Sequence, residues 1–167
     1  YFVINAFAQT ATTFTSQNFA AQDKERCKKI YRHCTFIGLA SCLGLSMIFL
    51  IGRHLFIQIF STDENVIHYA MIRMWSVCLL ELLTGVYEIS GGCLRGMGHS
   101  MTPAVITVLG TCVFRLVTIY AAHRSYLMLM IVYPVSWVIT GTAVTVAYFI
   151  IRRKEFAQIG KRRADII

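Results

Sequence analysis

The amino-acid sequence predicts an all-α, polytopic membrane protein. Of its 167 residues, 56% are hydrophobic and only 14% are charged, whereas soluble domains have about 45–50% and about 25%. The mean hydropathy is +0.60, and the net charge of +8 comes from basic residues gathered between apolar stretches. This composition excludes a disordered chain, a collagen-like repeat and a disulfide miniprotein, and it argues against a water-soluble globular domain.

Five apolar stretches are long enough to cross a bilayer as helices. The hydrocarbon core of a bilayer is about 30 Å thick and needs about 20 residues of helix. The predicted spans are 1–22, 34–52, 66–94, 103–122 and 126–151, and a basic tail follows over 152–167. The sequence starts at Tyr1, without an initiator Met and inside the first stretch. We therefore expect it to be a piece of a longer protein.

The first stretch has no charge but many polar residues. Asn5, Gln9, Thr12 and Ser16 are spaced by four, three and four positions, so they share one face of a helix. Such a face turns toward a water-filled cavity that binds a ligand, or it forms hydrogen bonds to other helices with no ligand. The sequence alone favours both interpretations equally.

Residues 23–33 predict a short surface helix before the second span. Lys24, Lys28 and Arg32 recur every four residues and Glu25 precedes Lys28 by three, a pattern that stabilises a helix. A nucleic-acid-binding patch is the rival interpretation, and it fits poorly between two membrane spans. In the second span, small residues favour close contacts between helices: Gly38, Ser41, Cys42 and Gly44.

The last three spans are separated by short connections. Residues 95–102 contain two glycines and predict a turn, and Pro103 fits the first turn of the next helix, where its missing N–H costs little. Residues 123–125 predict a second tight turn. Pro134 lies inside the final stretch and predicts a kink.

The basic residues predict the orientation of the chain in the membrane. When the connections alternate between the two sides, one side receives twelve Lys and Arg residues and the other receives two, Arg53 and Arg124. Basic residues mark the cytoplasmic side. We therefore expect a multi-pass protein of the plasma membrane whose C-terminus is cytoplasmic and whose surroundings are lipid, not nucleic acid. The twelve are Lys24, Arg26, Lys28, Lys29, Arg32, Arg95, Arg152, Arg153, Lys154, Lys161, Arg162 and Arg163.

Charged residues inside the spans need partners or functions, because burying them in lipid is unfavourable. At 1.5 Å per residue, Glu81 lies about 21 Å from the inner end of its helix and Arg115 about 18 Å from the inner end of the next. We expect these two to form a buried, structural ion pair. Glu88 has no obvious basic partner. It is either a carboxylate that takes up H⁺ or Na⁺, or a water-exposed residue near the cytoplasmic mouth. Arg73 lies near the outer end of its span, where its side chain can reach water.

Aromatic side chains gather near Pro134. Tyr133 and Trp137 could stack on an organic cation, although aromatics more often pack within the protein or lie at the membrane interface. The chain contains none of the common catalytic or nucleotide-binding motifs of enzymes. The six cysteines and five histidines lack zinc-ligand spacing, so we predict no enzymatic activity, no metal and no organic cofactor.

Four segments together are similar to one transporter family. SQNFAAQDKERCKKIYR at 16–32, FSTDENVIHYA at 60–70 and CLRGMGHSMTP at 93–103 resemble segments of the multidrug and toxic compound extrusion (MATE) transporters. YPVSW at 133–137 matches the last helix of bacterial members. The resemblance implies a twelve-helix transporter with two lobes, of which this chain is the incomplete second lobe. The first lobe would then be a missing partner.

The resemblance also implies a function. MATE transporters export drugs and organic cations by alternating access, coupled to Na⁺ or H⁺. Some members have an aspartate in the third of these helices, where this chain has Thr84. Glu81, one turn away, could substitute for it. The candidate residues for the coupling ion or the substrate are therefore Glu81, Glu88, Thr84, Asn5 and Gln9. Two alternatives stay open: a lipid-linked saccharide flippase of the same superfamily, and a membrane fragment that does not transport.

Overall fold

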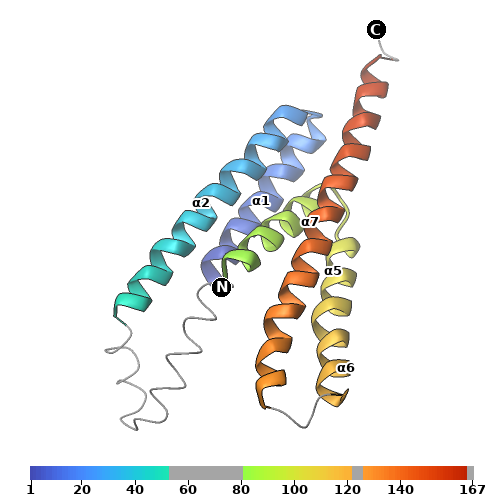
Figure 1. The fold of residues 1–167 in the computed structure, drawn as a ribbon. Helices are drawn as coiled ribbons and strands as arrows, with labels where there is room; N and C mark the ends of the chain where they lie inside the picture. Colours follow the sequence, from blue (N-terminus) through green and yellow to red (C-terminus); the bar gives the residue numbers. More distant parts are fainter. Residues whose placement is uncertain (53–80, 122–125, 165–167) are drawn as a thin grey trace.

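The computed structural model describes residues 1–52, 81–121 and 126–164, and all its regular elements within those ranges are helical. The elements are α1 (Phe2–Ala20), α2 (Lys24–Ile51), a helical segment over 81–96, α5 (Met101–Thr107), η1 (Val108–Val113), α6 (Phe114–Ala121) and α7 (Tyr126–Ala164). In Figure 1, α1 lies beside α2, and α5 and α6 run beside α7. The all-α prediction is confirmed.

Three helices in the described ranges are long and apolar enough to cross a membrane. They are Lys24–Ile51, Met101–Tyr120 and Pro134–Ile159. The predicted span 1–22 is helical as α1 but is not among them. The predicted span 66–94 lies partly outside the described residues. Arg73 is among the residues that are not described. These apolar helices support the prediction of an integral membrane protein.

A tight turn joins α1 to α2. Gln22 adopts a left-handed conformation with φ 57°, and the side chain of Asp23 accepts a hydrogen bond of 3.0 Å from the backbone N–H of Arg26. This is an N-cap, which satisfies a free donor at the start of α2. The separate surface helix expected over 23–33 is wrong, because α2 continues from Lys24 to Ile51 as one helix. No proline interrupts this range, so nothing forces the helix to end before the apolar stretch.

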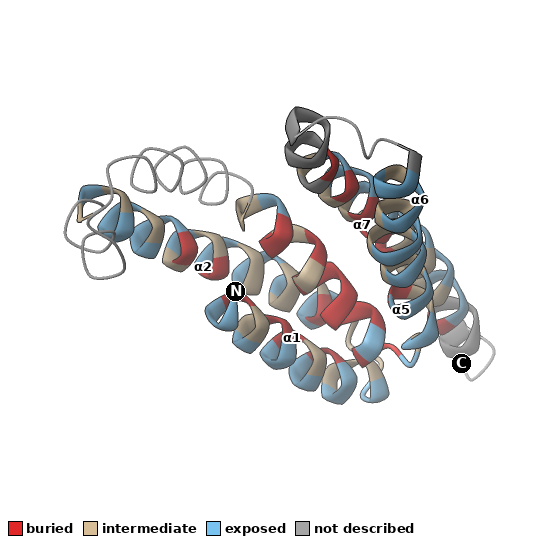
Figure 2. Cartoon of the chain, turned by 90° about the horizontal axis from the view of Figure 1, so that it is seen from below, coloured by how far each residue is buried: buried red, intermediate tan, exposed pale blue. Residues whose placement is uncertain are grey.

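The segment 81–96 is the most buried helix of the bundle. Its side chains with at most 7% exposure include Thr84, Tyr87, Ile89, Ser90, Cys93 and Leu94, and Figure 2 shows buried residues along the helix surfaces that face one another. The segment ends in a turn where Gly98 has φ 88° and the N–H of His99 donates to the carbonyl oxygen of Leu94 at 3.0 Å. The predicted turn is confirmed, with the helix extending to residue 96.

The two final helices are long, and one contains an irregularity. α5, η1 and α6 follow one another without a break, and η1 is a π-helical turn of six residues. A side chain at Gly110 in η1 would collide with the side chain of Thr140, so the two helices approach closely there. α7 contains Pro134 and extends to Ala164. Part of the region expected as a tail is therefore helical.

Aromatic stacking holds α7 against the rest of the bundle. Tyr148 is 2% exposed and stacks on Tyr31 of α2 with ring centroids 4.5 Å apart. The hydroxyl groups of Tyr31 and Ser90 form a hydrogen bond of 3.3 Å. These contacts fix α2, α7 and the segment 81–96 relative to one another, and so they position the walls of the cavity described next.

Candidate functional site

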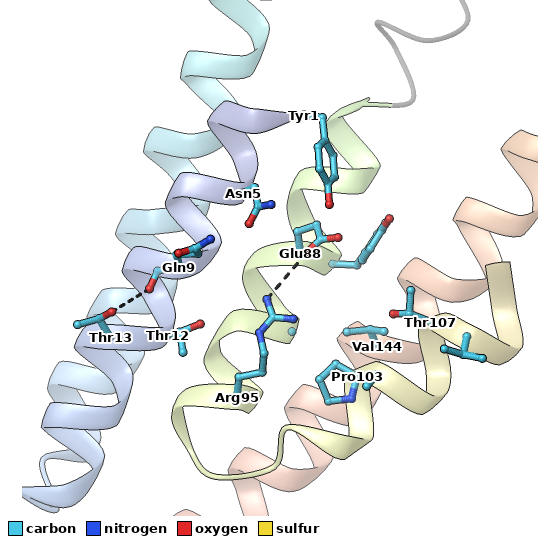
Figure 3. Close-up of a pocket in the computed structure, with 14 residues that line it drawn as sticks. Tyr1, Asn5, Gln9, Thr12, Thr13, Glu88, Arg95, Pro103, Thr107 and Val144 are labelled. Atoms are coloured by element: carbon cyan, nitrogen blue, oxygen red, sulfur yellow. Dashed lines mark hydrogen bonds and ion pairs between the residues drawn. The ribbon is translucent and has the colours of Figure 1, made fainter. Parts of the chain in front are cut away.

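A polar cavity of about 690 Å³ lies between α1, the segment 81–96, α5 and α7. Figure 3 shows Asn5, Glu88 and Arg95 in the space between these helices. The volume falls within the usual range of small-molecule sites. The lining residues are Tyr1, Asn5, Gln9, Thr12, Thr13, Tyr87, Glu88, Gly91, Arg95, Pro103, Ala104, Thr107, Val108 and Val144.

The polar face of α1 forms one wall of the cavity. Asn5, Gln9 and Thr12 line it together with Thr13. Ser16 does not, and its hydroxyl donates to the carbonyl oxygen of Thr13 at 2.8 Å. Thr12 also bonds across helices, because its hydroxyl lies 3.0 Å from the carbonyl oxygen of Gly92. The face therefore combines both expected arrangements: a cavity wall and a hydrogen bond between helices.

Two glycines allow α1 to lie this close to the segment 81–96. A side chain at Gly92 would collide with the carbonyl oxygen of Ala8. At Gly96, an added Cβ would lie 2.6 Å from the carbonyl oxygen of Thr12. The two glycines are four residues apart, the spacing by which small residues bring helix backbones together in membranes.

Glu88 faces the cavity and has a basic neighbour. A carboxylate oxygen of Glu88 lies 4.0 Å from a guanidinium nitrogen of Arg95, and the two side chains are 18% and 39% exposed. The expectation that Glu88 lacks a basic partner is wrong. The two residues are seven positions apart, so they lie two turns apart on the same side of the helix, and the long arginine side chain reaches back. The spacing of seven was the sequence signal that could have indicated this pair.

The expected ion pair between Glu81 and Arg115 is absent from the described residues. Glu81 instead contacts the amino group of Tyr1 at 3.1 Å, a contact that exists only where Tyr1 carries a free amino group. Arg115 donates from Nε to the hydroxyl of Ser136 at 2.9 Å. The depth argument did not determine direction around the helix axis, and Arg115 faces α7.

Two other candidates in the described part of the chain, Thr84 and Trp137, do not line the polar cavity. Thr84 is buried at 4% exposure. Trp137 contacts Arg115, whose guanidinium carbon lies 5.7 Å from the centre of the indole ring. Trp137 also lines a separate cavity of about 260 Å³ between the segment 81–96 and α7. The side chain of Tyr133 lies outside the described residues.

The structure also brings residues into the cavity wall that the sequence reasoning did not select. Arg95 was interpreted only as a marker of the cytoplasmic side, and Tyr87, Pro103 and Thr107 were not considered as site residues, yet all four line the cavity. Tyr87 precedes Glu88 on the buried face, and Thr107 comes from another helix. The position of Thr107 at the cavity could not be predicted from spacing along the chain.

Comparison with solved structures gives the fold independently. The crystal structure of the eukaryotic MATE transporter AtDTX14 matches with a TM-score of 0.62 and 15% sequence identity. The match covers 93% of this chain and 37% of that one, so the chain spans little more than a third of that transporter's length. At this identity the match shows the fold.

Comparison with protein families gives the family. No curated protein matches this sequence. The model of the MatE family, however, matches residues 1–121, which include the polar face of α1 and the whole segment 81–96. The chain therefore belongs to the MatE family of membrane transporters.

Proposed function

We propose that this chain forms part of a secondary active transporter that exports drugs or organic cations by alternating access, coupled to Na⁺ or H⁺. The observation that carries the proposal is the carboxylate of Glu88 at the wall of a polar cavity within a MatE-family chain. An acidic side chain inside a membrane bundle is typical of ion and substrate pathways. The missing first lobe would complete the cavity, and the MATE fold of AtDTX14, which is longer than this chain, supports this view.

Glu88 provides a physical basis for exchange of cations. Its carboxylate can bind one cation at a time, so a coupling ion and a cationic substrate would compete for it. Arg95, 4.0 Å away, holds the carboxylate when neither is bound. The amide groups of Asn5 and Gln9 supply oxygen ligands on the opposite wall, and oxygen is the ligand that hard cations prefer. Tyr87 adds an aromatic ring for an organic cation.

The orientation of the chain in the membrane belongs to the same proposal. So does the bacterial type of the transporter, which rests on YPVSW at 133–137. We place the C-terminal end of α7 in the cytoplasm of the plasma membrane, because that end contains Arg152, Arg153 and Lys154 in its described part and basic residues mark that side. A fluorescent protein fused to the C-terminus should then be bright in intact cells. Cleavage of the fused protein by a protease added outside intact cells would contradict this orientation.

The test compares substitutions of three carboxylates in the whole protein that contains this chain. Reconstituted into vesicles, the wild type should export a fluorescent organic cation when a Na⁺ or pH gradient is imposed. Glu88→Gln keeps the shape and removes the charge, so we expect export to fall at least tenfold. Glu155→Gln is the matched control, because Glu155 contacts His99 at 3.1 Å and does not line the cavity.

Glu81→Gln separates the two acidic candidates on this helix. Loss of export in Glu81→Gln with normal export in Glu88→Gln would move the coupling site to Glu81, as the family resemblance implies. Normal export in both variants, at wild-type protein levels, would contradict a role for either carboxylate. Absence of gradient-driven export in the wild type would contradict the proposed function itself.

A further inference from the structure

A second hollow lies on the other side of α1, at the end of the bundle where α1 and α2 are joined. It has a volume of about 640 Å³ and is distinct from the polar cavity, because the two have no lining residue in common. Its walls combine basic and apolar side chains: Arg26, Lys29 and His33 with Phe14 and Ile30. We name this feature the α1–α2 groove.

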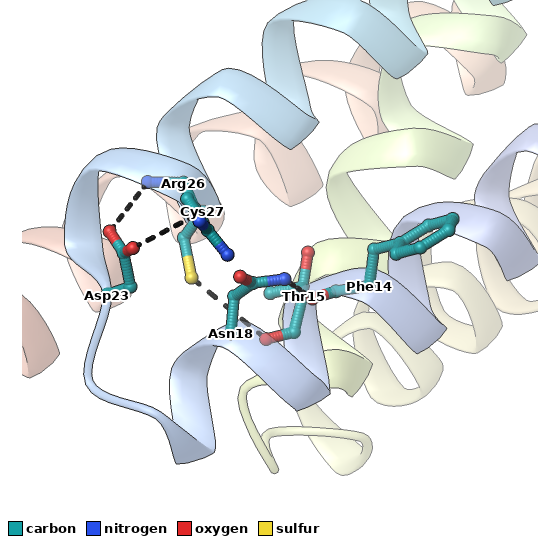
Figure 4. Close-up of polar contacts among 6 residues, drawn as sticks. All are labelled: Phe14, Thr15, Asn18, Asp23, Arg26 and Cys27. Atoms are coloured by element: carbon teal, nitrogen blue, oxygen red, sulfur yellow. Dashed lines mark hydrogen bonds and ion pairs between the residues drawn. The ribbon is translucent and has the colours of Figure 1, made fainter.

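The charged residues that line the groove are all basic. No acidic residue is among the described residues that line it. Arg26 shares an ion pair of 3.3 Å with Asp23 but stays 74% exposed, and Figure 4 shows this pair at the turn before α2. Within the described part of the chain, Lys29 and His33 take part in no ion pair. The lining of the groove therefore has a net positive charge, although Arg26 is paired with Asp23.

The height of the groove corresponds to the headgroup layer of a membrane. The uncharged, apolar part of α2 starts at Cys34, and Lys29 lies five residues before it, or about 7.5 Å along the axis. The polar layer on each side of a bilayer core is about 5–8 Å thick. Phe14 is 50% exposed and lies on the same side as Ile30, so the groove has an apolar surface next to its cationic one.

We propose that the α1–α2 groove binds the headgroup of an anionic phospholipid, with Arg26, Lys29 and His33 around the phosphate and Phe14 and Ile30 against the upper part of the acyl chains. Basic pockets between membrane helices on the cytoplasmic side bind anionic headgroups in this way. The exposed amide of Gln17 supplies a further hydrogen-bond donor. The occupant is a lipid rather than a soluble anion because of the apolar surface.

The test measures lipid binding by thermal stabilisation of the whole protein in detergent. Phosphatidylglycerol should raise the unfolding midpoint at concentrations where phosphatidylcholine does not. In the double variant Arg26→Gln/Lys29→Gln, we expect the half-saturating concentration of phosphatidylglycerol to rise about tenfold. The matched control is Arg32→Gln/Lys154→Gln, which removes two exposed charges near the same end without touching the groove. It should change this concentration less than twofold.

Three results would overturn the proposal. They are an equal loss of affinity in both double variants, equal stabilisation by phosphatidylcholine, and equal stabilisation by inorganic phosphate, which would indicate a site for a free anion. Lys29→Gln/His33→Gln provides a second groove variant should the first fail to fold. Lipid binding is read out without any transport step, so this result is independent of the export experiment.

Discussion

The two sides of the bundle accommodate charge in opposite ways. On the side of α1, Glu88 and Arg95 stand 4.0 Å apart at the wall of a cavity of about 690 Å³. On the side of α6 and α7, Arg115 donates to the fully buried hydroxyl of Ser136 and lies over the ring of Trp137. The first contact spans 4.0 Å and is open to water, whereas the second spans 2.9 Å and is packed between helices.

This difference separates a site that can exchange partners from a contact that holds helices together. A loose, partly solvated ion pair contributes little to stability, so another cation can replace Arg95 at Glu88. A charge-assisted hydrogen bond of 2.9 Å at a buried hydroxyl is stronger. We therefore infer that α1 and the segment 81–96 form the functional wall, and that α6 and α7 form its support.

The largest expected effect comes from the glycines of the functional wall. Gly92→Ala places a methyl group against the carbonyl oxygen of Ala8, so α1 must move away. We expect a loss of about 1–3 kcal/mol of stability, seen as a lower unfolding midpoint and less protein in the membrane.

Gly44→Ala is the control for this substitution. Gly44 lies in α2, and no atom of the other described elements lies within 4 Å of an added methyl group. Since alanine favours a helix over glycine by up to about 1 kcal/mol, the control should be neutral or stabilising. Equal destabilisation of both variants would contradict the close approach at Gly92.

An intermediate effect is expected from the partner of Glu88. Arg95→Gln removes the charge that competes with other cations at the carboxylate. In the whole transporter, the half-saturating concentration of the coupling cation should fall about five- to tenfold.

Lys154→Gln serves as the comparison for Arg95→Gln, because it removes an exposed charge of α7 that does not line the cavity. An unchanged half-saturating concentration in Arg95→Gln would show that the pair plays no part in cation binding.

The smallest expected effect concerns the supporting helices. Arg115→Lys removes the planar Nε–H group that donates to Ser136, so we expect a loss of about 1 kcal/mol of stability. The export rate for each folded molecule should stay unchanged. Ser136→Ala should cause a similar loss, and the double variant should lose less than the sum of both, because the two residues share one contact. Additive losses, or a specific loss of export, would contradict a purely supporting role.

Sequence reasoning succeeded where a single helix carries the information. The polar face of Asn5, Gln9 and Thr12 follows from spacing within α1, and the cavity indeed lies along it. The turn at Gly98 and the position of Pro103 in the first turn of α5 follow from local backbone geometry. The prediction of a separate surface helix failed because the basic and apolar halves of α2 differ in solvent preference, not in backbone conformation.

Reasoning from depth alone failed where two helices had to be oriented. Residue counting predicted similar heights for Glu81 and Arg115, yet rotation about the helix axes also decides whether such residues meet. Arg115 faces α7. Gly92 is a second example. The reason that this position requires a glycine becomes clear only when the carbonyl oxygen of Ala8 is placed beside it.

The sequence by itself determined the class of the protein, its helical nature and its family resemblance, because apolar length, charge clustering and local motifs are properties of consecutive residues. Only the tertiary structure decided which polar residues share a cavity, which partner Glu88 has and where the α1–α2 groove lies. Those features depend on helix rotation and close approach. Both are fixed by small residues packed against a neighbouring backbone.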